Sequence, residues 1–151
     1  MSLTLETLEK LIEFESVSSN SNLKLIGYIK DFCLKRGAFI QVVLNKSGEK
    51  AGLIARFGPN VGGGVILSGH TDVVPTTGQN WTRPPFKLTR ELDRFYGRGT
   101  TDMKAFLACM MSVADLASNA KLVKPLTLVF SYDEEVGCIG IQEMKVELKD
   151  K

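Results

Sequence analysis

The sequence predicts an α/β protein in which a mixed sheet lies between helices. Segments of helical periodicity alternate with short apolar strands, which is the pattern of that fold class. The 151 residues are 44% hydrophobic and 24% charged, which provides one core but too little chain for two independent domains. We therefore treat residues 1–151 as one domain.

Two helices are predicted at the start of the chain. Residues 4–15 repeat apolar side chains at helical spacing and place charged residues opposite them, so they predict an amphipathic helix. The polar run SVSSNSN at 16–22 ends it. A second helix is predicted to begin after Ser21 or Asn22 as its N-cap and to end at Gly37.

The pattern then changes to that of strands. Residues 38–44 and 52–57 flank the turn 45–48, which predicts an antiparallel hairpin. The strand at 65–68 is continuously apolar. Such a run is typical of a central strand covered on both faces, and we expect that position for it.

The second half of the chain repeats the alternation. Residues 87–90 and 94–96 predict a small hairpin, and 126–132 predict another strand. Residues 103–117 are apolar nearly all round, which predicts a helix buried between layers. Residues 139–148 predict a final helix with one apolar side.

The charge balance excludes several classes of function. The 19 basic and 17 acidic residues give a formal net charge of +2, and no block of like charge favours nucleic acid. No apolar run reaches the roughly 18 residues of a membrane span, and the acidic, amphipathic N-terminus is unlike a signal peptide. We expect a cytoplasmic protein that binds neither nucleic acid nor membrane.

The cysteines Cys33, Cys109 and Cys138 are odd in number and far apart. This spacing argues against a disulfide framework and against a zinc knuckle. We interpret all three as small buried apolar side chains.

A first polar cluster follows the strand at 65–68. His70, the sole histidine of the sequence, stands two residues before Asp72. Residues i and i+2 of an extended segment point the same way, so Asp72 can accept a hydrogen bond from one ring nitrogen while the other faces a metal. The alternative is that both side chains only complete a turn.

A second cluster, GRGTTDMK at 97–104, leads into the helix predicted at 103–117. Its glycines permit unusual backbone angles, and it places Asp102 just before the apolar helix. An acidic residue in that place is most often a helix N-cap, which is the alternative to a functional role.

The third cluster is Asp133, Glu134 and Glu135, directly after the strand at 126–132. Three adjacent carboxylates repel one another, and a metal cation would stabilise them. A solvated acidic loop is the alternative. Ligand sites of open α/β sheets lie beyond the carboxyl ends of strands, which is where His70 and the third cluster stand.

Together the clusters contain the residue types of a hydrolytic zinc site, namely imidazole and carboxylate ligands with one further carboxylate as base. The sequence segments around them are SGHTDVVP at 68–75, YGRGTTDMKAF at 96–106 and FSYDEEVGCIG at 130–140. These motifs resemble the M20 family of metal-dependent aminoacylases and carboxypeptidases. Within it they look like the acetylornithine deacetylases, with the succinyl-diaminopimelate desuccinylases as the alternative.

The resemblance implies a zinc-peptidase-like catalytic domain with two Zn²⁺ ions, for which Co²⁺ can substitute. It implies that His70 binds one metal, that Asp102 bridges the two, and that Glu135 binds the other. Asp72 would orient His70. Glu134 would be the general base, moving a proton from the attacking water to the departing amine.

The resemblance also implies a cis peptide bond after Asp102. The implied substrate is a small N-acyl amino acid, N-acetylornithine, which is hydrolysed to ornithine and acetate in arginine biosynthesis. Full-length members of the subgroup are expected to be homodimers.

Members of the family are much longer than this chain and carry a later carboxylate ligand and a second ligand histidine. We expect the chain to be the N-terminal half of such a catalytic domain, without the lid domain, weakly metal-binding and barely active. An exposed apolar sheet edge would then favour self-association. Two alternatives are a hydrolase whose missing ligands come from another chain and a metal-binding module without activity.

Overall fold

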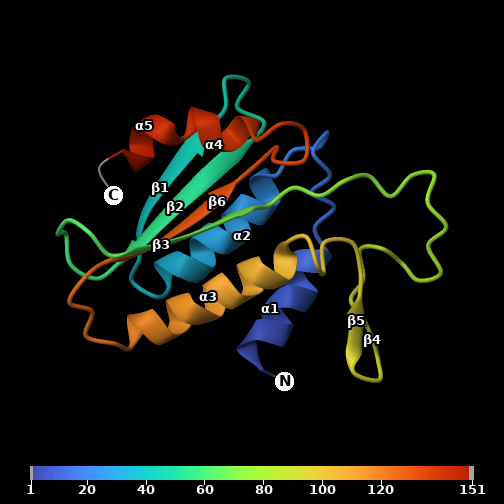
Figure 1. Cartoon of the computed structure of the whole chain (residues 1–151), viewed down its shortest axis with the longest axis horizontal. Coiled ribbons are helices and arrows are strands. Elements are labelled where there is room, and N and C mark those ends of the chain that lie inside the picture. Colours follow the sequence, from blue (N-terminus) through green and yellow to red (C-terminus); the bar gives the residue numbers. More distant parts are fainter. Residues whose placement is uncertain (1, 150–151) are drawn as a thin grey trace.

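The computed structural model describes residues 2–149 and confirms the α/β class. Helices and strands alternate along the chain as predicted (Figure 1). In chain order the elements are α1 (Leu3–Ile12), α2 (Leu23–Leu34), β1 (Phe39–Leu44), β2 (Ala51–Phe57), β3 (Val65–His70), β4 (Thr89–Glu91), β5 (Arg94–Tyr96), α3 (Lys104–Ser118), β6 (Leu126–Ser131), α4 (Ile139–Glu143) and α5 (Lys145–Leu148).

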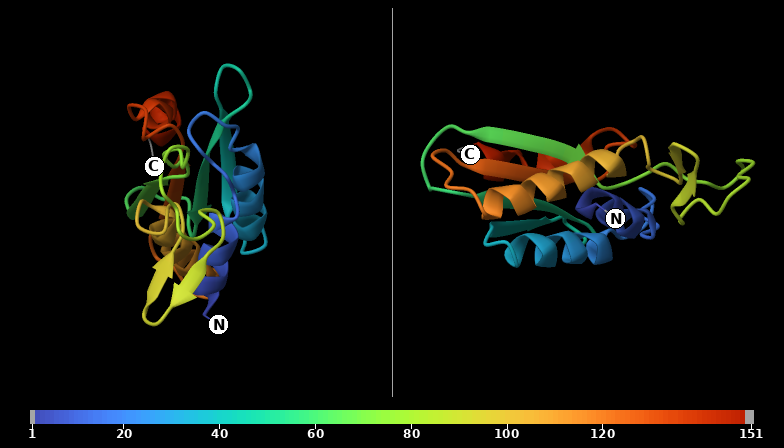
Figure 2. Two further views of the ribbon diagram at one scale, coloured as in Figure 1. Left: turned by 90° about the vertical axis from the view of Figure 1, so that its right-hand side faces the viewer. Right: turned by 90° about the horizontal axis from the view of Figure 1, so that it is seen from below.

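The main sheet is mixed, in the order β1-β2-β6-β3. The hairpin of β1 and β2 is antiparallel, β6 is antiparallel to β2, and β3 is parallel to β6. Helices α1, α2 and α3 cover one face of this sheet, and α4 and α5 lie on the other (Figures 1 and 2). The mixed sheet between helices is therefore confirmed.

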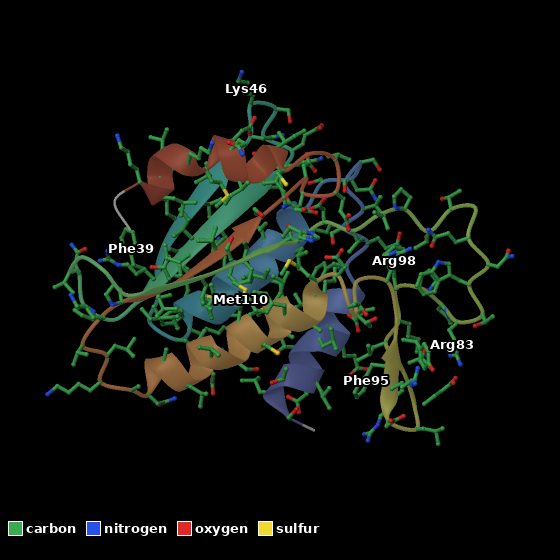
Figure 3. The ribbon with its side chains drawn as sticks, in the orientation of Figure 1. Phe39, Lys46, Arg83, Phe95, Arg98 and Met110 are labelled. Carbon is green, nitrogen blue, oxygen red and sulfur yellow. The ribbon has the colours of Figure 1, made fainter. Side chains whose placement is uncertain are left out.

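A lobe made of residues 75–98 projects from this layered body (Figure 1). Strands β4 and β5 form a separate antiparallel pair there. The side chains of Arg83, Phe95 and Arg98 belong to the lobe and lie away from the sheet (Figure 3).

The main core fills the space between the sheet and the three helices on its first face. Met110 lies between α3 and the sheet (Figure 3), and it is almost fully buried together with Leu53 of β2 and Leu128 of β6. A smaller core on the second face joins Ile54, Val129 and Met144. Both faces of the central strands β2 and β6 are therefore buried, and this close packing makes the sheet rigid.

The predicted central position of the strand at 65–68 is wrong. β3 lies at an edge of the sheet, and within residues 2–149 β6 is its one hydrogen-bonded neighbour in that sheet. Val65 is 58% exposed and Ile66 is 48% exposed, whereas Gly69 and His70 are buried. A continuous apolar run shows how strongly a strand avoids water, but strand order depends on residues far away in the chain.

The helix predicted at 103–117 is present as α3, but it is not buried between layers. One side packs on the sheet and on α1, while Phe106, Val113 and Leu116 face outward, the last 70% exposed. Cys33 is buried as expected, whereas Cys109 is exposed and Cys138 only partly buried, contrary to the expectation for them. An all-round apolar composition therefore did not identify which side of the helix meets the sheet.

Other predictions needed smaller corrections. Helix α1 ends at Ile12 rather than at residue 15, and the helix predicted at 139–148 is broken into α4 and α5 at Met144. Asn22 occupies the N-cap position of α2 without a side-chain cap bond. Across residues 2–149 the structure contains no helix with the length and hydropathy of a membrane span.

Candidate metal centre

The site lies where the parallel strands β3 and β6 end at the same edge of the sheet. The register pairs His70 with Ser131, so the residues that follow each strand emerge side by side. Thr71 extends the pairing by one step, because its backbone N–H and its hydroxyl both donate to the carbonyl of Ser131, at 2.9 and 2.7 Å. Two polar clusters separated by some sixty residues are thereby brought together.

His70 stands at the centre of the site with an exposed fraction of 5%. Its Nδ1 lies 3.0 Å from the backbone carbonyl oxygen of Asp72 and 3.4 Å from Oδ1 of the same residue. Its Nε2 points the other way, 3.0 Å from Oδ1 of Asp102 and 3.7 Å from Oε2 of Glu134. Nδ1 thus contacts Asp72, and Nε2 faces the carboxylates of Asp102 and Glu134.

Asp72 is buried and accepts several hydrogen bonds. The backbone N–H groups of Glu134 and Glu135 donate to its Oδ1 and Oδ2 at 3.1 and 3.3 Å, and the hydroxyl of Ser18 donates to Oδ2 at 2.6 Å. Burial raises the pKa of this carboxyl, but the bonds from His70, Ser18 and the two N–H groups lower it to about 2. Asp72 therefore joins the end of β3 to the loop after β6.

The two glutamates after β6 reach toward His70. Ligand atoms of His70, Glu134 and Glu135 all lie within 4.8 Å of one another. Asp133, the third carboxylate of this run, does not share the cluster. It is buried and pairs with the ammonium of Lys50 at 2.6 and 2.7 Å, so the solvated-loop alternative is wrong for this residue.

Asp102 enters the site from the loop before α3. The cap position of that helix belongs to Met103, so the N-cap alternative for Asp102 is wrong. The bond between Asp102 and Met103 is cis, as the family resemblance implied. The sulfur of Met103 lies 3.3 Å from the backbone nitrogen of His70, which places this loop against the end of β3.

Lys104 attaches the same loop to the end of α1. Its ammonium is buried and donates to the carbonyl oxygens of Leu11 and Phe14 at 2.9 and 2.7 Å, at the end of α1. Burial lowers the pKa of Lys104 to about 7.

The charges in the cluster fit a divalent cation. Burial opposes protonation of His70, yet its hydrogen bonds to Asp72 and Asp102 and the attraction of Asp72 raise its pKa to about 9. Burial, and next the negative charge of Asp102, raise the pKa of Glu135. Imidazole and carboxylate donors at this separation match the ligands of a catalytic zinc site, where a metal would replace the imidazole proton in offsetting the carboxylate charges.

The cluster borders a hollow of about 370 Å³. The carboxylates of Asp102 and Glu134 remain accessible, with 69% and 44% of the side chains exposed. Serine hydroxyls and apolar side chains complete the wall, from Ser68, Met103, Ser131 and Ile141. The arrangement can therefore admit a small molecule beside the candidate metal ligands.

Some supporting residues were missed by reasoning from sequence. Ser18 and Asn22 lie in the run that was interpreted as the end of one helix and, at Asn22, as a possible N-cap of the next, yet both are buried. The side-chain nitrogen of Asn22 donates to the backbone carbonyl of Ala51 at 2.8 Å. The side-chain oxygen of Asn22 accepts from the backbone N–H of Ala51 at 2.9 Å. Lys50 was not singled out either. A polar run gives no local signal that distinguishes a solvated loop from a buried network.

The fold and the histidine–carboxylate cluster define an α/β domain with a candidate metal centre beyond the ends of two parallel strands. Residues 66–151 match Peptidase family M20/M25/M40, and this is more than half of the chain. The chain therefore belongs to that family, as its motifs predicted.

Curated relatives agree with this assignment. Acetylornithine deacetylase of Vibrio parahaemolyticus serotype O3:K6 (strain RIMD 2210633) is 37% identical over 142 residues, covering 90% of this chain and 37% of that protein. Acetylornithine deacetylase of Pasteurella multocida (strain Pm70) is 37% identical over 121 residues, covering 80% and 31%. The chain spans about a third of the length of the curated relatives it matches.

Solved structures show the same fold. The M20 family metallo-carboxypeptidase Sso-CP2 from Sulfolobus solfataricus superposes with a TM-score of 0.85 at 25% identity, covering 100% of this chain and 36% of that one. Human carnosine dipeptidase 1 has a TM-score of 0.84 at 23% identity, covering 98% and 35%. The zinc-peptidase-like fold expected from the motifs is confirmed at the level of this family.

Proposed function

We propose that residues 1–151 form the N-terminal, metal-binding part of the catalytic domain of a hydrolase that converts N-acetylornithine to ornithine and acetate. One observation carries the proposal: ligand atoms of His70, Glu134 and Glu135 lie within 4.8 Å of one another beyond the ends of two parallel strands. Relatives named acetylornithine deacetylase support this choice of substrate among N-acyl amino acids.

We propose that His70, Asp102 and Glu135 would hold the metal. When bound, the divalent metal, Zn²⁺ or in its place Co²⁺, polarises the carbonyl of the scissile amide and offsets negative charge that develops on its oxygen. The position of His70 Nε2, 3.0 Å from the Asp102 carboxylate, supports this ligand set. Asp72 orients the histidine from its opposite nitrogen.

Glu134 is the general base of the proposed reaction. Its partly exposed carboxylate borders the hollow and can accept a proton from the attacking water. The same carboxyl then donates this proton to the departing amine of ornithine. The hollow gives the acyl group room beside Met103 and Ile141.

The test separates metal binding from hydrolysis. The purified 151-residue chain is titrated with Zn²⁺ against a chromophoric chelator and assayed for ornithine release from N-acetylornithine, with N-succinyl-diaminopimelate as the competing substrate. We expect Glu135→Gln to weaken metal binding. Glu134→Gln should retain the metal and abolish whatever release the chain supports.

Release that is faster with the succinyl compound would contradict the proposed substrate. Release that survives in Glu134→Gln would contradict the role of the base. Tight Zn²⁺ binding with no release from either compound would favour a metal-binding module over a hydrolase.

A further inference from the structure

We infer that Ser18 is a positioning residue of the metal centre, acting through Asp72 on the ring of His70. This inference deepens the proposed function and rests on it. Ser18 lies in the polar segment 16–22 between α1 and α2, 54 residues before Asp72 in the sequence. It belongs to none of the three clusters that carry the family motifs.

The segment 16–22 is held beside the site by its own backbone. Val17 and Val73 form a parallel bridge, the N–H of Ser18 donates to the carbonyl of Val73 at 3.2 Å, and the N–H of Val73 donates to the carbonyl of Ser16 at 3.0 Å. The hydroxyl of Ser16 donates to the carbonyl of Thr71 at 2.7 Å. These contacts place Ser18 beside Asp72 independently of the Ser18 side chain.

The Ser18 hydroxyl then determines the orientation of the Asp72 carboxylate. It donates to Oδ2 at 2.6 Å, which is shorter than the 3.3 Å contact from the N–H of Glu135 to the same oxygen. The other oxygen, Oδ1, accepts from the N–H of Glu134 and lies 3.4 Å from Nδ1 of His70. Without the hydroxyl, Oδ2 keeps only the longer contact, so the carboxylate is held less firmly and its 3.4 Å contact with Nδ1 of His70 should lengthen.

Lys50 links the backbone of Ser18 to Asp133 in the loop after β6. Its ammonium contacts both carboxylate oxygens of Asp133, at 2.6 and 2.7 Å, and donates to the carbonyl of Ser18. Both side chains of this ion pair are largely buried. Asp133 directly precedes Glu134. The Lys50 ammonium therefore joins segment 16–22, which contacts Asp72, to the loop after β6, which carries the two glutamates.

Because His70 is the sole histidine of the chain, its ring signals in ¹H–¹⁵N NMR spectra are assigned without ambiguity. We would compare the wild type with Ser18→Ala in zinc-free and zinc-loaded protein. The matched control is Ser19→Ala, because among residues 2–149 the exposed hydroxyl of Ser19 has one hydrogen-bond contact, with its neighbour Asn20 at 3.4 Å. Lys50→Met tests the second attachment.

We expect Ser18→Ala to weaken the 3.4 Å contact between the Asp72 carboxylate and Nδ1, while the 3.0 Å contact of Nδ1 with the backbone carbonyl of Asp72 remains. The Nδ1–H signal should move upfield and exchange faster with water, and Zn²⁺ affinity should fall about tenfold, the lower end of the effect of an outer hydrogen-bond partner of a metal ligand. Ser19→Ala should match the wild type in both measurements. Lys50→Met should lower Zn²⁺ affinity in the same direction.

Unchanged His70 signals and unchanged Zn²⁺ affinity in Ser18→Ala would overturn the inference. So would a lower resistance to urea with an unmoved Nδ1–H signal, because that result describes a merely structural serine. If the wild type binds no Zn²⁺ at all, the proposed function fails by itself. The zinc-free spectra of the two serine variants still decide the role of Ser18 in that case.

Discussion

The two ends of strand β3 differ in almost every physical respect. At the carboxyl end, Gly69 and His70 are buried, and each ring nitrogen of the histidine lies close to an oxygen atom. At the amino end, Val65 and Ile66 are about half exposed. An apolar hollow of about 430 Å³ opens there between the start of β3, the end of α3 and the segment that leads into β6.

The difference shows that burial along one strand follows its neighbours rather than its composition. The polar end is covered because loops from three other parts of the chain converge on it, carrying Ser18, Asp102 and Glu134. Buried polar groups need partners, and such groups are costly when a partner is lost. The apolar end has few polar contacts to lose, so changes there should act through packing and association.

The largest expected effect concerns the polar end. His70→Ala removes the imidazole of the proposed metal site, and Zn²⁺ affinity should fall by more than about 100-fold, beyond the usual effect of an outer partner. Competition with a chromophoric chelator measures this change. The control Val65→Thr, at the other end of β3, should retain the affinity of the wild type. Equal affinity in His70→Ala would show that the metal binds elsewhere.

The next effect concerns the backbone at the apolar end. Gly64 has a φ of +115°, and a Cβ there would overlap the carbonyl oxygen of Pro125. Gly64→Ala should therefore lower the free energy of unfolding by about 2–3 kcal/mol, as measured by urea denaturation. Gly62→Ala is the matched control, because a Cβ at Gly62 meets nothing within 4 Å. Equal stability of the two variants would contradict the described path of the chain into β3.

A smaller effect is expected for the exposed side chain of Ile66. Ile66→Lys should change the free energy of unfolding by no more than about 0.5 kcal/mol, because the side chain is half in water already. It should also reduce self-association in sedimentation velocity, since a lysine on an open edge discourages strand pairing. A loss of stability comparable to that of Gly64→Ala would mean that this end of β3 is covered in solution.

The smallest effect on stability is expected at the cysteines. Cys109 lies on the exposed side of α3, whereas burial raises the pKa of the Cys33 thiol to about 12. At pH 8 a maleimide should label Cys109 in the folded protein, and Cys33 should react only after unfolding in urea. Cys109→Ser should remove the label from the α3 peptide, leave that of the partly exposed Cys138, and keep the urea midpoint unchanged. Mass spectrometry of tryptic peptides would reveal the opposite order.

Much of this protein could be predicted from short stretches of sequence. Helical periodicity gave α1 and α2 to within a few residues, and the turn at 45–48 gave the hairpin of β1 and β2. The motifs around His70, Asp102 and Glu134 predicted family membership. These features are encoded by residues that are close in sequence, so local periodicity and motif spacing were sufficient for them.

Tertiary structure alone decided the order of the strands and the support of the site. The edge position of β3 follows from its pairing with β6, and the contacts of Ser18 with Asp72 and of Lys50 with Asp133 each join residues more than fifty positions apart. A sequence pattern records how strongly a residue avoids or tolerates water. Which distant residue then excludes the water, or accepts the hydrogen bond, depends on the free energy of the whole chain.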